Sequence, residues 1–207
     1  MTRVLCFAAV LAMATPASAD VLNLFVEAGA GGAFGTATGG DQRLKDSAFF
    51  AKAPHFEYGL LAGVELVFLD AWIQHHQLTD GRRIATWTQF GLGVHFQAGL
   101  GDAKQQKAHE GGFFELGLGG WFGLGTGQQV DPPLDNAQIT DKAVLVEGRI
   151  GVGTHLNSVF DLGVAVPLSW GYFFKNGNGA AINDASTHYQ SVQGEVLVFL
   201  RGNLRLL

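Results

Sequence analysis

Carboxylates placed just before glycines are the residues of this sequence whose type and spacing could do chemistry. Glu27, Glu115 and Asp161 open the related segments "EAGAG", "ELGLG" and "DLGVA", and Arg149 and Arg201 are basic residues that could meet them. In one enclosed space, such groups could line a cation-conducting pore, hold a proton or neutralise one another. We favour the third interpretation, because charges in a narrow interior must be paired or change their protonation state.

The prediction for these groups is therefore an internal ion-pair network. Its expected members are Glu27, Glu115, Glu147, Arg149, Asp161, Glu195, Arg201 and Arg205. Within it, we expect Arg149 and Arg201 to pair with Glu147, Glu195 or Glu115. Acidic residues outnumber basic ones in this set, so any leak through the interior would favour cations.

Histidines and loop residues give weaker signals for a metal or catalytic site. His75 and His76 are adjacent, so in a strand they would point to opposite faces and could not share one metal ion. His95 is interpreted as an interior polar group and not as a ligand. Residue types found in lipid-modifying enzymes occur at Asp46, Ser47, His55, Asp184, Ser186 and His188, but their spacing specifies no catalytic triad. The sequence therefore predicts no catalytic residue, metal ligand or cofactor.

Strict alternation along the chain indicates the elements that must position these groups. In "FFELGLGGWFGLGTG" (residues 113–127), Leu116 and Leu118 share one parity, whereas Glu115 and most of the glycines share the other. A period of two residues is typical of a β-strand. The pattern predicts eight strands, with 69–79 the weakest, at residues 21–34, 56–67, 69–79, 85–100, 112–126, 142–154, 160–174 and 190–205. An even number of strands of ten or so residues favours an antiparallel up-and-down transmembrane β-barrel.

The glycines indicate which face of these strands lies inside. An eight-stranded barrel is only wide enough for side chains to fill it, so inward glycines would leave room for charged and aromatic groups from neighbouring strands. Trp72, Trp87 and Trp121 fall on this inner parity and are expected to act as plugs. The apolar parity would then face lipid, as at Leu92, Leu116, Leu118, Val164 and Val196.

The first nineteen residues have the features of a secretory signal peptide. Arg3 precedes a short apolar core, and "ASA" ending at Ala19 offers a small-residue cleavage site. Cys6 lies in this leader, so the predicted barrel domain (20–207) has no cysteine for a disulfide or a thiolate metal site. Hydrophobic residues make up 47% of the chain and charged residues 15%, with no long basic run. Nucleic acid is therefore not an expected partner.

The eight alternating segments resemble, in their architecture, those of small eight-stranded outer-membrane barrels, the class often called OmpA-like. The resemblance spans residues 20–207 without a following periplasmic domain, although Leu207 stands where such barrels usually end in an aromatic residue. It implies a monomer in the bacterial outer membrane, in contact with membrane lipids, lipopolysaccharide and the assembly machinery. The expected role is structural or surface interaction. A narrow, porin-like passive channel for small solutes or cations is the alternative, and a lipid-modifying enzyme is the third.

Overall fold

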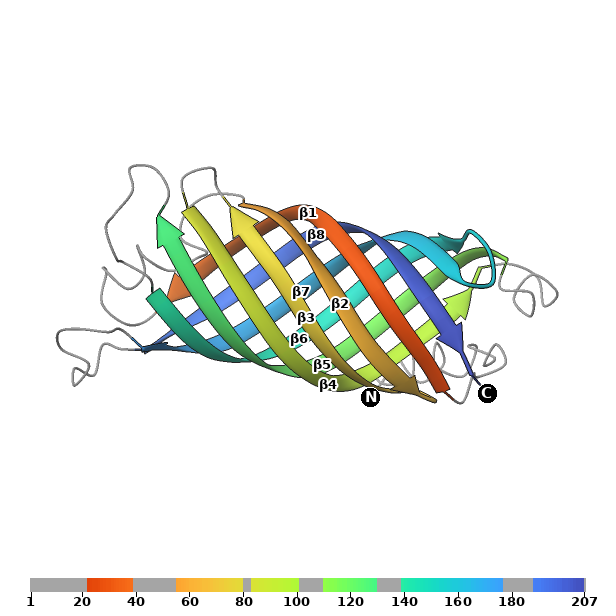
Figure 1. Ribbon diagram of the computed structural model, residues 1–207, viewed down its shortest axis with the longest axis horizontal. Coiled ribbons are helices and arrows are strands. Elements are labelled where there is room, and N and C mark those ends of the chain that lie inside the picture. The colour runs from red at the N-terminus through yellow and green to blue at the C-terminus, as the bar shows by residue number, and fades with distance from the viewer. Residues whose placement is uncertain are drawn as a thin grey trace, which may run out of the picture.

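The chain forms a closed barrel of eight antiparallel strands (Figure 1). The computed structural model describes residues 22–38, 55–79, 83–100, 110–129, 139–176 and 188–206. The strands are β1 (Leu22–Thr38), β2 (His55–Leu66), β3 (Leu69–Thr79), β4 (Arg83–Gly99), β5 (Gly111–Gln129), β6 (Ile139–His155), β7 (Phe160–Asn176) and β8 (His188–Arg205). Each strand pairs with the next along the chain, and β1 pairs with β8 to close the sheet. The predicted fold class is confirmed.

All eight predicted strands are present, and the weakest of them, 69–79, has the predicted bounds. Most of the other strands run further than predicted at the end of the barrel remote from the termini, where β1 reaches Thr38 and β5 reaches Gln129. The exception is β2, predicted at 56–67, which is shifted by one residue to His55–Leu66. At the remote end the backbone ladder continues past the last apolar residues, as the pairing of Thr38 with Gln190 shows. The alternation of apolar and polar residues marks only the apolar part of a strand. Strand lengths predicted from it are therefore shorter than the hydrogen-bonded strands.

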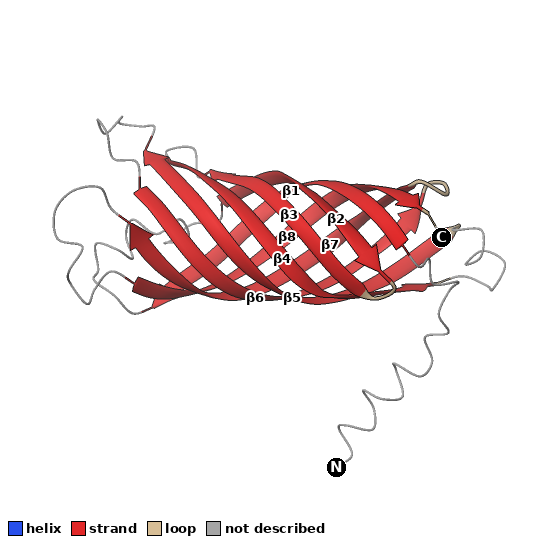
Figure 2. Ribbon diagram, turned by 60° about the horizontal axis from the view of Figure 1, so that its bottom comes forward, coloured by secondary structure: helices blue, strands red, loops and turns tan. Residues whose placement is uncertain are grey.

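Strands are the regular elements of the described chain (Figure 2). None of the described segments is a helix long and apolar enough to cross a bilayer. The predicted signal peptide at 1–19, the terminal Leu207 and the loop residues Asp46, Ser47, Asp184 and Ser186 lie outside the described residues.

The outer face of the barrel is apolar and the inner face carries the polar groups. Leu92 is 71% exposed, and Leu118, Val164 and Val196 are likewise exposed on the outside, while Leu116 is partly covered there. The buried polar and charged residues include Asn23, Glu27, Glu57, Asp70, Glu115, Asp161, Gln193, Glu195, Arg201 and Asn203. This arrangement is the reverse of a water-soluble barrel, which puts its apolar face inside.

The inward glycines make room for the rings of neighbouring strands. A Cβ atom on Gly93 or Gly119 would lie 2.4 or 2.6 Å from the ring of Trp72, well inside van der Waals contact. Similarly, a Cβ on Gly163 would lie 2.6 Å from the ring of Phe199. The glycine face is therefore the surface into which the interior side chains pack.

Aromatic rings pack in the interior from beside His95 on β4 toward the end remote from the termini. Trp72 packs edge-on against Trp121 with 4.8 Å between ring centroids, and Trp87 packs edge-on against Phe173 at 5.5 Å. We call Trp72, Trp87 and Trp121 the tryptophan plug. The surrounding buried cluster consists of Ala33, Leu78, Ala143, Leu145 and Phe173. All three tryptophans thus lie in the interior, as predicted.

Candidate functional site

Four charged side chains from four strands meet in the interior. Arg149 on β6 donates to Glu115 on β5 (Nε to Oε1, 2.9 Å) and to Glu27 on β1 (Nη2 to Oε1, 2.8 Å). Arg201 on β8 donates to the same two carboxylates, from Nη1 to Glu115 Oε2 and from Nε to Glu27 Oε2, both at 2.9 Å. We call Glu27, Glu115, Arg149 and Arg201 the ionic quartet.

The ionic quartet is electrically balanced and largely buried. Glu115 has no exposed surface, and Glu27 and Arg201 are buried. Each carboxylate bonds to both guanidinium groups, so both of its oxygens have partners. The ring of Phe199 lies below both arginines, 5.1 and 4.9 Å from the guanidinium carbons, where its face attracts cations. Such a fully paired arrangement tolerates burial that a single charge would not.

The membership of the quartet differs in part from the sequence expectation. Glu115 pairs with both arginines, but Glu27 fills the place that the sequence assigned to Glu147 or Glu195. No ion pair joins Glu147 or Glu195 to either arginine within the described residues; these two acids line a neighbouring cavity of about 20 Å³. Arg201 lies opposite Glu27 on the paired strand β8, and the long side chain of Arg149 reaches across the lumen to β1, which strand parity alone does not reveal.

The remaining predicted members lie at the end of the barrel that carries the termini. Asp161 accepts from Asn203 Nδ2 at 2.8 Å and lies 2.6 Å from His155 Nδ1. Arg205 donates to the backbone carbonyl of Ser158. Both groups therefore hold strand ends and the β7–β8 seam, separately from the quartet.

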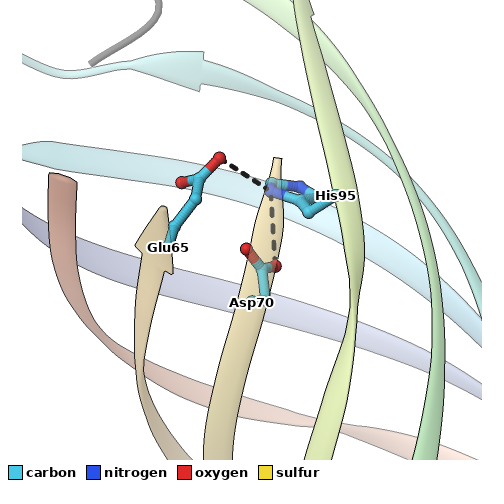
Figure 3. Close-up of side chains that lie close together, drawn as sticks. All are labelled: Glu65, Asp70 and His95. Carbon is cyan, nitrogen blue, oxygen red and sulfur yellow. Dashed lines mark ion pairs between the residues drawn. The ribbon is translucent and has the colours of Figure 1, made fainter. Parts of the chain in front are cut away.

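A second cluster joins Glu65, Asp70 and His95 (Figure 3). Glu65 and Asp70 are directly opposite on β2 and β3, which are connected by the two-residue turn at 67–68. His95 comes from β4, next to β3 in the sheet. Its Nδ1 lies 3.8 Å from Glu65 Oε1 and 3.9 Å from Asp70 Oδ2. We call these three residues the His95 cluster.

The His95 cluster borders the ionic quartet. His95 Nε2 lies 3.5 Å from Glu115 Oε2, so the ring stands between Glu115 on one side and Glu65 and Asp70 on the other. A cavity of about 70 Å³ touches both groups and is bounded by Trp72 and Trp121. This space suits a few water molecules or one small ion, but no larger solute.

Sequence reasoning did not find the His95 cluster. Parity places Glu65 and His95 on the inner face, but their proximity depends on the register of β3 against β4, in which Asp70 pairs with Gly93. The usable signal was the short connection between β2 and β3, which forces the acids on either side of it to face each other.

Comparison with known proteins defines the fold. No protein-family model matches the chain, and no curated protein matches it. Among solved structures, Neisserial surface protein A aligns at 14% identity with a TM-score of 0.54, covering 86% of this chain and 96% of that one. This chain has the fold of the small eight-stranded outer-membrane barrels. At such low identity the likeness is one of fold.

Two structures from Pseudomonas aeruginosa also align over most of their length. The outer membrane protein OprG aligns at 10% identity and a TM-score of 0.48, covering 89% of this chain and 96% of that chain. The N-terminal β-barrel domain of OprF aligns at 9% identity and a TM-score of 0.41, with coverages of 88% and 97%.

Proposed function

We propose that this chain is an integral outer-membrane protein, a closed β-barrel that serves a structural or surface-interaction role. The outward apolar face supports the membrane placement, because lipid-facing residues of such barrels are apolar. The closed sheet also supports it, because every strand pairs on both sides and its backbone hydrogen bonds can be satisfied without water. The aromatic pairs Phe56–Tyr58 and Tyr172–Phe174 lie at one end of the strands and Phe68–Phe96 at the other, as interfacial bands would.

The single observation that carries the proposed role is the filled lumen. The tryptophan plug extends from Trp72, beside the His95 cluster, toward the end remote from the termini, and the ionic quartet joins opposite walls of the barrel. The cavity beside the plug measures only about 70 Å³. A lumen packed in this way supports a scaffold for the connecting segments better than it supports a conduit.

The surface role rests on where the connections leave the barrel. The β1–β2, β3–β4, β5–β6 and β7–β8 connections all leave at the end opposite the termini. With the termini on the periplasmic side, we assign this end to the cell exterior, beside lipopolysaccharide. Labelling of intact cells at cysteines introduced into residues 130–138 tests the orientation, and labelling only after cell lysis would reverse it.

Planar-bilayer recording tests the closed lumen. We expect the purified protein to give no steady current under conditions in which a known porin conducts. A steady, cation-selective current that requires Glu147 and Glu195 would instead establish the narrow passive channel.

Incubation with phospholipid and lipopolysaccharide, followed by mass spectrometry, tests the enzyme alternative; we expect the lipids to be unchanged.

A further inference from the structure

We propose that Glu65, Asp70 and His95 form a binding site for one divalent transition-metal ion of the zinc class inside the barrel. The ligand atoms of the three residues all lie within 4.8 Å of one another. Ligands of a tetrahedral zinc ion are separated by roughly 3.3 Å, given bonds of about 2.0–2.2 Å. Small side-chain rotations therefore bring the three atoms into the coordination sphere.

Charge is the first argument for a cation at this position. The neighbouring ionic quartet neutralises itself, so it has no spare positive charge for Glu65 and Asp70. These two carboxylates face each other across paired strands, an arrangement that is destabilising for like charges. Among the described residues, His95 is the one basic group that forms an ion pair with them. A divalent cation would balance both carboxylates while the imidazole stays neutral.

Asp70 provides an independent second argument. Its side chain is only 9% exposed and points toward His95 (Figure 3). No described residue gives a hydrogen bond to its buried Oδ1 atom. A buried carboxylate oxygen without a donor is costly, and a coordinated metal ion would remove that cost.

The surroundings of the cluster orient its ligands in the way that metal sites require. Asn23 Nδ2 donates to Glu65 Oε2 at 3.3 Å, which leaves Oε1 directed toward His95. On the far side of the ring, His95 Nε2 faces Glu115, itself held by two arginines. The geometry of that contact gives no hydrogen bond, and Nε2 has no other hydrogen-bond partner among the described residues. A closer approach of Glu115 would hold the proton on Nε2 and free the other nitrogen for a metal. Here the free nitrogen is Nδ1, the atom nearest Glu65 and Asp70.

The ligand set and the position indicate which ion fits. One imidazole and two carboxylates suit zinc and its transition-metal neighbours, whereas magnesium and calcium prefer oxygen ligands alone. The side chain of Glu65 retains 22% exposure and ends β2 beside the 67–68 turn. A metal ion can therefore reach the cluster from the barrel end that carries the termini, below the tryptophan plug.

Calorimetric titration of the full chain, purified without an affinity tag, folded in detergent and stripped of metal, tests the site. We expect one Zn²⁺ per chain and much weaker binding of Mg²⁺. Loss of an outer partner of a metal ligand weakens binding about 10–100-fold, so His95→Gln and Asp70→Asn, which remove ligands themselves, should cost about 100-fold or more. Asn23→Leu should weaken binding by about 10-fold through Glu65.

His76→Gln is the matched control. His76 is also an interior histidine bonded to a carboxylate, Glu57, but it lies outside the cluster, so its loss should leave Zn²⁺ binding unchanged. The mobility of unheated samples on gels shows whether each variant is folded. X-ray absorption by the zinc-loaded wild-type protein, which needs no variant, should show nitrogen and oxygen ligands including one imidazole.

Three results would overturn the proposal. The first is Zn²⁺ binding that is equally tight in the wild type and in folded His95→Gln. The second is a zinc environment without imidazole, and the third is Mg²⁺ binding as tight as that of Zn²⁺. If His95→Gln lowers the heat resistance of the zinc-free protein and leaves Zn²⁺ affinity unchanged, His95 instead acts as a protonated partner of the two acids. None of these results would bear on the proposal that the lumen is closed, which bilayer recording tests separately.

Discussion

At the scale of single residues, the interior is organised by which charges have partners. Glu27 and Glu115 each accept from two guanidinium groups, whereas Glu65 and Asp70 share one histidine. Removing one member of a fully paired buried group leaves another charge uncompensated, which costs more than the pair itself contributes. The quartet should therefore be the most sensitive set of side chains in the lumen.

Arg201→Met tests that sensitivity. The substitution leaves Glu27 and Glu115 sharing only Arg149, so we expect the free energy of unfolding to fall by about 3–5 kcal/mol. Urea unfolding in detergent, followed by tryptophan fluorescence, measures the change. Arg205→Met is the comparison, because Arg205 lies at the strand end and donates to a backbone carbonyl; a similar loss there would contradict the special role of the quartet.

Gly119→Ala tests the packing of rings on glycines. The new methyl group would lie 2.6 Å from the Trp72 ring, whereas at Gly117, two residues earlier on the same face, the nearest atom is 3.5 Å away. We expect a loss of about 1–3 kcal/mol at Gly119 and little change for Gly117→Ala. The temperature at which the folded gel band disappears measures both, and equal tolerance would show that Trp72 does not need this space.

Parity in the sequence was sufficient to place single residues on the inner or outer face, but not to pair them. The inward positions of Glu115, Arg149 and Arg201 follow from alternation, since successive side chains of a strand point to opposite faces. The contact of Glu27 with both arginines depends on side-chain length and on the relative height of strands that are not neighbours in the chain. Those distances are properties of the closed barrel.

At the scale of the strand, β5 carries the clearest division between faces. Its outer residues Leu118, Phe122 and Leu124 are exposed, while Phe113, Glu115 and Trp121 on the other parity are buried. A one-residue slip in register would exchange the two faces. Pairing on both sides by β4 and β6 therefore fixes β5 in a single orientation.

Leu118→Arg tests the orientation of β5. Leu118 is exposed near the middle of the strand, so a charge there would lie in hydrocarbon and should cost about 2–4 kcal/mol near the bilayer midplane. Refolding into lipid vesicles with urea titration measures the cost, and Leu118→Ile should be nearly neutral. Equal stability of the two variants would mean that this face does not contact lipid.

The existence, order and parity of the strands could be predicted because the period of two persists over nearly the whole barrel. Strand ends could not, because polar residues such as Thr38 and Gln129 continue the backbone ladder without alternation. At the 67–68 turn, Val67 adopts a φ of 62°, a conformation that no local signal predicts for a β-branched residue.

At the scale of the whole molecule, aromatic rings pack inside the lumen and ion pairs link its walls. Trp72 and Trp121 contact each other at the centre of the tryptophan plug, and Trp72 also bounds the cavity that contains the His95 cluster. Removing both rings would join that cavity to the remote half of the barrel. The proposed closure therefore depends on a small number of side chains and not on the width of the sheet.

The double variant Trp72→Ala and Trp121→Ala should conduct. We expect small, steady current steps in planar bilayers where the wild type gives none, with a preference for cations because acidic groups outnumber basic ones along the interior. Trp170→Ala is the control. Trp170 points outward, so its substitution should produce no current. A double variant that is folded but carries no current would show that other side chains close the lumen.

The seam between β1 and β8 joins the first and last strands of the barrel. Glu27 lies on the first strand and Arg201 on the last, opposite each other across that seam. This contact needs β1 and β8 to be paired, so closing the sheet also completes the ionic quartet. We therefore expect a barrel that is assembling with this seam still open to hold Glu27 without one of its two guanidinium partners.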